Sequence, residues 1–306
     1  GLGWQRVRGQ RFFGAAVRTS EMRLEDYDLS RRYEAEVLDS RRISAAEAKD
    51  EVRDIQFEVD GRFDVQVGQN IGVLAPGRQE IGQDHHFRLY SIADVPQRTD
   101  DGKLRLSICV RRCYYIDEFS GERYPGIASN YLCDLKPGDK LTVTGPYGQA
   151  FPIPAENDAT LIMIGAGTGI APFRAFMKHF YQQRPDFQGR IWLFHGGDTG
   201  LDLLYRNREV DDFALYYDRE TFEAFNALSE RPGWSETTDW AAAMHARGEE
   251  LERWLSEPHT YVYVAGLERI IDELDLVLAE VAGSNRIWFR WKDDLKAEGR
   301  WVELVY

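Results

Sequence analysis

Cysteine is scarce in this sequence, with three residues among 306: Cys109, Cys113 and Cys133. An odd and sparse set argues against a disulfide framework and predicts a reducing compartment. An all-cysteine iron–sulfur cluster needs four thiolates, so this chain cannot hold one. Because no apolar segment of the secretory kind opens the sequence, we predict a cytoplasmic location. Cys109 and Cys113 fall in an apparent strand, and we interpret them as buried thiols.

Long apolar runs and an excess of basic charge are also missing. The longest apolar stretches, such as residues 159–165, are far shorter than the ~20 residues that cross a bilayer, which predicts no membrane insertion. The chain has 38 basic and 51 acidic residues, and this balance argues against nucleic-acid binding. Residues 156–306 hold 16 basic and 27 acidic residues, whereas residues 1–155 hold 22 and 24. We therefore expect an acidic protein partner to dock on the first half.

The length suggests two domains, and the residue pattern of the first half is typical of β-strands. Short alternating runs separated by turn signals occupy residues 33–44, 52–60, 70–76, 87–94, 103–115 and 140–148. Such runs predict an antiparallel β-barrel over residues 33–154. Residues 128–135 predict a short helix capped by Ser129. An arginine-rich arm, residues 1–32, precedes the barrel, and we interpret it as solvated or as part of a docking surface.

After Pro154 the pattern changes to strands that alternate with helices. Apolar strands are predicted at residues 159–165, 190–197 and 260–266, and helices at residues 171–183, 245–255 and 268–283. This alternation predicts an α/β domain with a doubly wound parallel sheet over residues 155–306.

Two motifs carry chemistry. Gly165, Gly167 and Gly169 follow a buried strand and open a helix, where glycines let the backbone approach a phosphate closely. Their spacing differs from the GxGxxG fingerprint, and a simple tight turn has the same appearance. In the other motif, alternation places Arg88 and Tyr90 on one strand face, which suits a phosphate beside an aromatic ring, although ordinary strand ends also look like this.

Together these motifs resemble the plant-type ferredoxin–NADP⁺ reductase family, a module shared with reductase components of bacterial oxygenases. The resemblance runs from Tyr33 to Tyr306. It rests on RLYS at 88–91, CVRRCYY at 109–115, GIASNYLCDLKPGD at 126–139, TGPYG at 144–148, GAGTGIAPFRAF at 165–176, WLFHGG at 192–197 and VYVAGL at 262–267. It implies an antiparallel β-barrel FAD domain followed by an α/β doubly wound NAD(P) domain.

The resemblance implies a set of FAD contacts on the barrel. Arg88 would hold the pyrophosphate, Tyr90 would lie against the isoalloxazine, and Ser91 would hydrogen-bond near the flavin N5. Tyr115 matches the aromatic residue that stacks on the adenine. Further FAD-site residues implied by the motifs are Leu89, Cys109, Val110, Ile127, Ala128 and Ser129.

The resemblance also implies the coenzyme contacts and the catalytic residues. Arg111 matches a basic residue that reaches the coenzyme phosphate. The path of the nicotinamide dinucleotide would be lined by Gly167, Thr168, Gly197, Gly266 and Leu267. Ser229 and Arg231 would read a 2′-phosphate. Ser91, Glu303 and Tyr306 are the predicted catalytic residues, with the Tyr306 ring stacked on the flavin.

Three positions depart from the family pattern. Ala265 stands where the family has a cysteine near the nicotinamide. In the loop that would bind the 2′-phosphate, the arginine is displaced by one residue, the family's lysine is absent and Asp239 adds an acidic side chain. The expectation of NADPH over NADH therefore rests mainly on the resemblance to the family. Glu303 lies one residue further from the terminal tyrosine than its family counterpart.

The sequence therefore predicts an FAD-dependent reductase that passes electrons between NAD(P)H and a separate one-electron carrier. The expected carrier is an acidic redox protein, ferredoxin or flavodoxin. Two alternatives stay open: the reductase component of a multicomponent oxygenase, and a flavin-binding electron-transfer or regulatory subunit without independent turnover. The chain holds no iron–sulfur cluster of its own, which favours the separate carrier.

Overall fold

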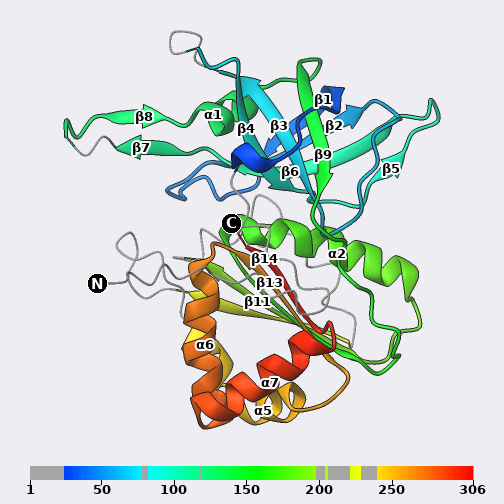
Figure 1. Cartoon of the computed structure of the whole chain (residues 1–306), viewed down its shortest axis with the longest axis vertical. Coiled ribbons are helices and arrows are strands. Elements are labelled where there is room, and N and C mark those ends of the chain that lie inside the picture. The colour runs from blue at the N-terminus through cyan, green and yellow to red at the C-terminus, as the bar shows by residue number, and fades with distance from the viewer. Residues whose placement is uncertain are drawn as a thin grey trace, which may run out of the picture.

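The computed structural model describes residues 24–77, 82–116, 119–197, 204–205, 221–228 and 240–305. They form an antiparallel sheet and a parallel α/β sheet, stacked along the long axis of the molecule (Figure 1). This order confirms the predicted fold class. The predicted boundary at residues 154–155 falls between the last strand of the first sheet and the first strand of the second. Within the described ranges, no helix is long and apolar enough to cross a membrane.

The first sheet has seven strands in the order β4-β3-β9-β1-β2-β6-β5, and β7 and β8 form a separate hairpin. Its elements are β1 (Arg32–Arg42), β2 (Val52–Val59), β3 (Asn70–Pro76), β4 (His85–Ser91), β5 (Gln97–Arg98), β6 (Leu104–Arg111), β7 (Tyr114–Ile116), β8 (Arg123–Pro125) and β9 (Lys140–Tyr147), with the helices η2 (Leu24–Asp26) and α1 (Ile127–Asp134). Alternate apolar residues of β2, such as Ile55, Phe57 and Val59, point into the core.

The second sheet is parallel, in the order β12-β11-β10-β13-β14. Its elements are β10 (Thr160–Ala166), β11 (Arg190–Gly197), β12 (Phe222–Leu228), β13 (Thr260–Gly266) and β14 (Trp301–Val305), with η4 (Gly167–Gly169), α2 (Ile170–Gln183), α4 (Trp240–His245), α5 (Gly248–Leu255), α6 (Arg269–Ala282) and α7 (Asn285–Ala297). Figure 1 shows α2 between the two sheets, while α5, α6 and α7 cover the far face of the parallel sheet.

One apolar core runs through both domains. It joins barrel residues such as Ile55 and Ile108 to Phe173 and Phe176 of α2. A second core, with Trp192, lies between the parallel sheet and the helices on its far face. Since the shared core buries large side chains from both sheets, apolar packing holds the two domains together.

Three sequence-based expectations were wrong in detail. The expected strand at residues 103–115 is interrupted, because β6 ends at Arg111 and β7 begins at Tyr114. Ser129 does not cap α1: the N-cap is Gly126, and the Ser129 hydroxyl accepts a hydrogen bond from the Cys113 amide at 2.9 Å. Cys109 and Cys133 are buried thiols, but Cys113 lies between the strands and is half-buried.

The second half holds elements that the pattern did not predict. The helix expected at residues 245–255 is divided into α4 and α5. Strand β12 and helix α7 were not predicted. Helix α7 is capped by Ser284, whose hydroxyl accepts a hydrogen bond from the Ile287 amide at 3.2 Å.

Candidate functional site

A first cavity lies on the antiparallel domain where it faces α2. Its lining comprises Asn70, His86, Arg88, Leu89, Tyr90, Ser91, Cys109, Arg111, Cys113, Gly126, Ile127, Ala128, Ser129, Thr168 and Ala171. Strand β4 supplies a guanidinium, a phenol and a hydroxyl to this lining, and β6 and α1 supply further residues of it. The predicted pairing of a cation with an aromatic ring is therefore present at one cavity.

Hydrogen bonds hold the β4 side chains. The Arg88 guanidinium donates from Nη1 to the Phe87 carbonyl at 2.8 Å. The Ser91 hydroxyl donates to the Asn70 side-chain carbonyl at 2.8 Å, and Asn70 is buried. The Tyr90 ring packs against the main core. The side chains that β4 contributes to the cavity wall are thus held in place by hydrogen bonds and by core packing.

The N-terminus of α1 adds backbone donors to the same cavity. The first amides of a helix have no partner within it, and the N-cap residue Gly126 has no side chain that could cap them. Asn130 ties this helix start to the β6–β7 connection, because its amide donates to the carbonyls of Cys113 at 2.9 Å and Gly126 at 2.8 Å. Backbone amides at a helix start suit an anionic group such as a pyrophosphate.

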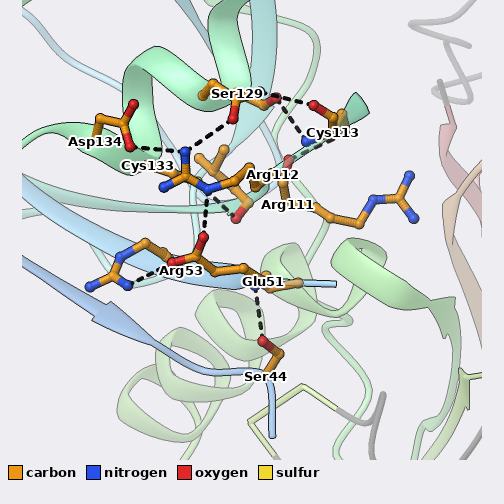
Figure 2. A network of polar contacts seen from close by, with 12 residues as sticks. Ser44, Glu51, Arg53, Arg111, Arg112, Cys113, Ser129, Cys133 and Asp134 are labelled. Atoms are coloured by element: carbon orange, nitrogen blue, oxygen red, sulfur yellow. Dashed lines mark hydrogen bonds and ion pairs between the residues drawn. The ribbon is translucent and has the colours of Figure 1, made fainter. Parts of the chain in front are cut away.

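Figure 2 shows the polar network behind this wall, centred on Arg112. The Arg112 guanidinium donates to the Glu51 carboxylate, to Asp134 at 2.8 Å and to Asn130 at 3.0 Å. Partial burial by itself raises the pKa of Glu51, but hydrogen bonds from Arg112 and Arg53 outweigh it and leave that pKa below its usual value. Arg112 and its partners Glu51, Asn130 and Asp134 link the start of β2, the β6–β7 connection and α1 without lining the cavity, whereas Cys113 and Ser129 of the same figure do line it.

A second cavity lies at the carboxyl ends of the parallel strands. Its lining comprises Ser44, Lys49, Asp50, Val52, Arg111, Ala166, Gly167, Thr168, Gly196, Gly197, Leu204, Trp240, Leu267, Arg269, Ile270 and Glu273. This edge of an open α/β sheet is where ligands commonly bind. Lys49, Arg111 and Arg269 bring positive charge to it, and Asp50 and Glu273 bring negative charge.

Glycine is required at the strand–helix turn of this cavity. Gly167 has a φ of +54°, a conformation that side chains disfavour. A Cβ at Gly169 would lie 2.4 Å from the carbonyl oxygen of Ala265, so this backbone approach admits no side chain. The turn brings Thr168 to the cavity and leads directly into α2.

The two cavities share Arg111 and Thr168 in their linings. Arg111 ends β6 of the first domain and forms an ion pair of 3.8 Å with Asp50. Thr168 belongs to the glycine turn of the second domain. A group bound in one cavity can therefore meet a group bound in the other at the junction of the domains.

Most predicted site residues line one of these cavities. Leu89, Cys109, Ile127, Ala128 and Ser129 line the first cavity with Arg88, Tyr90 and Ser91. Gly167, Gly197 and Leu267 line the second. Val110 and Gly266 line neither: Val110 is buried in the core, and Gly266 ends β13 beside Leu267.

Several predicted residues have no described side-chain position. Tyr115 lies in β7, and its side chain is outside the described part of the chain. Ser229, Arg231 and Tyr306 also lie outside the described residues. Their roles stay predictions.

Glu303 lines neither cavity. It is 4% exposed, and its carboxylate accepts a hydrogen bond from the Trp301 indole at 2.8 Å. Trp301 belongs to the core on the far face of the parallel sheet, whereas the neighbouring Leu304 belongs to the core shared with the first domain. Because alternate residues of a strand share a face, Glu303 points with Trp301, away from the core shared with the first domain, and its catalytic role stays a prediction.

The structure also adds residues that sequence reasoning missed. His86 shares the strand face of Arg88 and Tyr90, so alternation could have found it. Lys49 and Trp240 reach the second cavity from a loop and a helix start, where no local pattern marks them. Among the described residues, no cluster of histidine, cysteine or acidic side chains could hold a metal ion.

Comparisons with known proteins agree with this arrangement. A family model described as an oxidoreductase NAD-binding domain matches residues 163–275. The chain is 34% identical over 285 residues to the chloroplastic ferredoxin–NADP reductase leaf isozyme 1 of Arabidopsis thaliana, covering 90% of this chain and 77% of that protein. It is 33% identical over 276 residues to the chloroplastic reductase of Spinacia oleracea, covering 87% and 73%.

A solved structure gives the same fold. The ferredoxin–NADP⁺ reductase from Plasmodium falciparum superposes with a TM-score of 0.68 at 20% identity, covering 92% of this chain and 98% of that one. The resemblance predicted from the motifs is thus confirmed, and the chain belongs to the plant-type ferredoxin–NADP reductase family of oxidoreductases.

Proposed function

We propose that this chain uses FAD to pass electrons between NADPH and ferredoxin, a separate one-electron carrier. The observation that carries the proposal is the meeting of the two cavities at Arg111 and Thr168. A hydride can pass only between groups in direct contact, so a reductase needs its flavin and its coenzyme at one junction. The relatives at 33–34% identity are named for the same reaction.

The donor set of the first cavity fits FAD. A guanidinium and the amides of a helix start suit a pyrophosphate, and the Tyr90 ring suits a flat aromatic system. We propose that Arg88 and residues 127–129 hold the pyrophosphate, that Tyr90 lies along the isoalloxazine and that Tyr115 stacks on the adenine. Bound FAD would supply the exchange between a two-electron hydride donor and one-electron transfers.

The chain's own residues would position the reacting groups. The Ser91 hydroxyl donates to Asn70, which fixes the direction of its remaining lone pairs at the cavity. Thr168 and the glycine turn would hold the nicotinamide end of the coenzyme, and Arg111 its phosphates. Tyr306 would cover the flavin until the nicotinamide displaces it.

For the coenzyme we propose NADPH. The second cavity offers Lys49, Arg111 and Arg269 for phosphate groups. The matched Plasmodium falciparum reductase is known in complex with 2′P-AMP, a ligand that carries the phosphate distinguishing NADPH. In this chain Ser229 and Arg231 would read that phosphate.

For the carrier we propose ferredoxin, docked on the first domain. Residues 1–155 have 22 basic and 24 acidic residues, whereas the rest of the chain has 16 and 27. An acidic carrier is repelled least by the first domain, which also holds the flavin cavity. Three free thiols suit a reducing compartment, and we propose the cytoplasm.

The test begins with the purified protein. It should be yellow and release FAD rather than FMN, because the adenine contact has no counterpart in FMN. Single-turnover mixing with NADPH and with NADH in turn should bleach the flavin faster with NADPH. With NADPH and ferredoxin present, the protein should then reduce cytochrome c through ferredoxin. A colourless protein that FAD cannot reconstitute would overturn the proposal.

A further inference from the structure

A buried polar cluster crosses the boundary between the two domains. Asp54 of β2 is 6% exposed and Arg174 of α2 is 4% exposed. The hydroxyl of Tyr205, a fully buried residue of the second domain, donates to the Asp54 carboxylate at 2.6 Å. Arg174 lies 3.7 Å from the same carboxylate oxygen, and its guanidinium sits 4.6 Å from the centre of the Tyr205 ring.

Asp54 faces the second domain and not the interior of its own sheet. On β2 the neighbouring Ile55 is buried on the opposite face, so Asp54 points toward Tyr205 and Arg174 of the second domain. It is buried because the second domain covers it. Asp54 pairs across the sheet with Cys109, and Cys109 lines the flavin cavity. The cluster therefore lies directly beside that cavity.

Arg174 connects the cluster to the segment after β4 and to the helix that follows the glycine turn. Its guanidinium donates to the carbonyl of Ala93 at 2.8 Å, two residues after Ser91. It also lies 3.5 Å from Asp94, which receives a hydrogen bond of 3.1 Å from Lys178. The helix that carries Arg174 begins at Ile170, immediately after the glycine turn. One side chain thus ties the end of β4 to the helix that follows Thr168.

Apolar packing alone already joins the domains, so the cluster is not needed for attachment. Burying charged groups is costly unless each is paired and hydrogen-bonded. Apolar contacts tolerate small sliding, whereas a cluster of directed bonds is satisfied in one arrangement. Tyr205 also has a φ of +59°, the one positive φ of a non-glycine residue in the described part of the chain. A side chain held at such a cost points to a positional requirement.

We propose that Asp54, Tyr205 and Arg174 form an interdomain clamp that sets the flavin cavity against the Gly167–Gly169 turn. They are positioning residues, since they act through Cys109, the end of β4 and α2 and do not contact the reacting groups. The proposal rests on the proposed function, because the distance it fixes is the one that hydride transfer requires. Misplacement of reacting groups by about 1 Å can cost on the order of 100-fold in rate.

The test uses Tyr205→Phe, which removes one hydroxyl, and Asp54→Asn, which keeps the shape of the side chain. Tyr263→Phe is the matched control: Tyr263 is also fully buried, and its hydroxyl donates to the Pro152 carbonyl at 2.7 Å. In single-turnover reduction by NADPH, both clamp variants should lose roughly 10- to 100-fold in the saturating rate constant. Their Kd values for FAD and NADPH should change less than twofold. The long-wavelength charge-transfer absorbance of the complex between coenzyme and flavin should weaken.

A second readout needs neither coenzyme nor turnover. In the apoprotein, alkylation of Cys109, located by mass spectrometry, should be about tenfold faster in the clamp variants and unchanged in Tyr263→Phe, because opening the clamp exposes a buried thiol. If the wild-type flavoprotein is not reduced by NADPH or NADH, the proposed function fails while Cys109 alkylation still tests the clamp. Wild-type reduction rates in both clamp variants would overturn the positioning role. Cys109 protection equal to wild type in both would overturn the clamp.

Discussion

The two cavities are built by different means. The first cavity, where we propose FAD, is walled by side chains, with Arg88, Tyr90 and Ser91 arranged along one strand. The second cavity, where we propose the coenzyme, opens at or just beyond strand ends on the glycines Gly167, Gly196 and Gly197, which carry no side chain. The first can therefore be weakened by removing atoms, and the second by adding them.

The difference follows from the two sheets. In an antiparallel sheet, alternate side chains of a strand stand on one face and can form a wall. In a parallel sheet, ligands bind beyond the carboxyl ends of the strands, where the chain must turn and approach the ligand with its backbone. This chain thus combines one cavity shaped by side chains with one shaped by the backbone.

Adding a single methyl group at the glycine turn should have the largest effect. In Gly169→Ala the new Cβ would lie 2.4 Å from a backbone oxygen that cannot rotate away. Overpacking of this kind costs roughly 1–3 kcal/mol or more. We expect a lower thermal midpoint and a loss of about 100-fold in NADPH-driven flavin reduction, with the Kd for FAD changed less than twofold.

The matched control for this change is Gly248→Ala. Gly248 begins α5 with no atom within 4 Å of a new Cβ, so alanine should be neutral or slightly stabilising there. A Gly169→Ala protein that melts and reacts like wild type would show that the turn tolerates a side chain.

Removing the guanidinium of Arg88 should raise the Kd for FAD, the quantity that Gly169→Ala leaves nearly unchanged. A hydrogen bond to a charged group is worth about 1.5–3 kcal/mol, or roughly 10- to 150-fold in Kd. In Arg88→Ala the Kd for FAD, measured by fluorescence titration of the apoprotein, should rise by that factor. Arg62→Ala, which removes an exposed arginine paired with Asp60, is the control. Equal FAD affinity in the two variants would place the pyrophosphate elsewhere.

Strand alternation and turn signals predicted those parts of the site whose residues are close together in the sequence. Arg88, Tyr90 and Ser91 follow from strand alternation, and Thr168 follows from a glycine turn between a buried strand and a helix. Strand β13 was predicted with its observed bounds because its short run alternates tyrosine with valine, residue types that favour strands, and ends at a glycine. The domain order also follows from such runs, and the structure confirms it.

Other features depend on contacts between distant segments. Asp54 has the pattern of an outward, solvated residue of β2 and is buried only because the second domain covers it. Arg112 gathers Glu51 from the residue before β2 and both Asn130 and Asp134 from α1, two segments far apart in the sequence. No periodicity marks such a network, since its members share a place in the fold and not a spacing along the chain.

Loosening this network should weaken FAD binding less than the loss of Arg88 does. Arg112 lines no cavity and would act through the position of α1. Arg112→Lys cannot keep three acceptors at once. Because Arg112 does not line the cavity, only part of that loss should reach FAD binding through α1, about 0.5–1.5 kcal/mol, or roughly 2- to 12-fold in Kd. Arg53→Lys is the control, because Arg53 also donates to Glu51 but otherwise bonds to Ser40 on β1. If both variants weaken FAD equally, the link from Arg112 to α1 is not what matters.

The smallest expected effect is the pH dependence that Glu51 gives the antiparallel domain. Hydrogen bonds from Arg112 and Arg53 lower the pKa of Glu51 despite its partial burial. A carboxyl with a lowered pKa in the folded state stabilises the protein above its ordinary pKa of about 4.3, and that contribution is lost as the pH falls. Wild type should therefore exceed Glu51→Gln by roughly 0.2–1 kcal/mol at pH 7, the range for partly exposed ion pairs. Urea midpoints should show this difference shrinking as the pH is lowered through the carboxyl range, whereas Glu47→Gln, at an exposed site on the same segment, should track wild type. A difference that stays constant over this range would mean that Glu51 does not contribute through its charge, and that the Arg112 network holds α1 by shape alone.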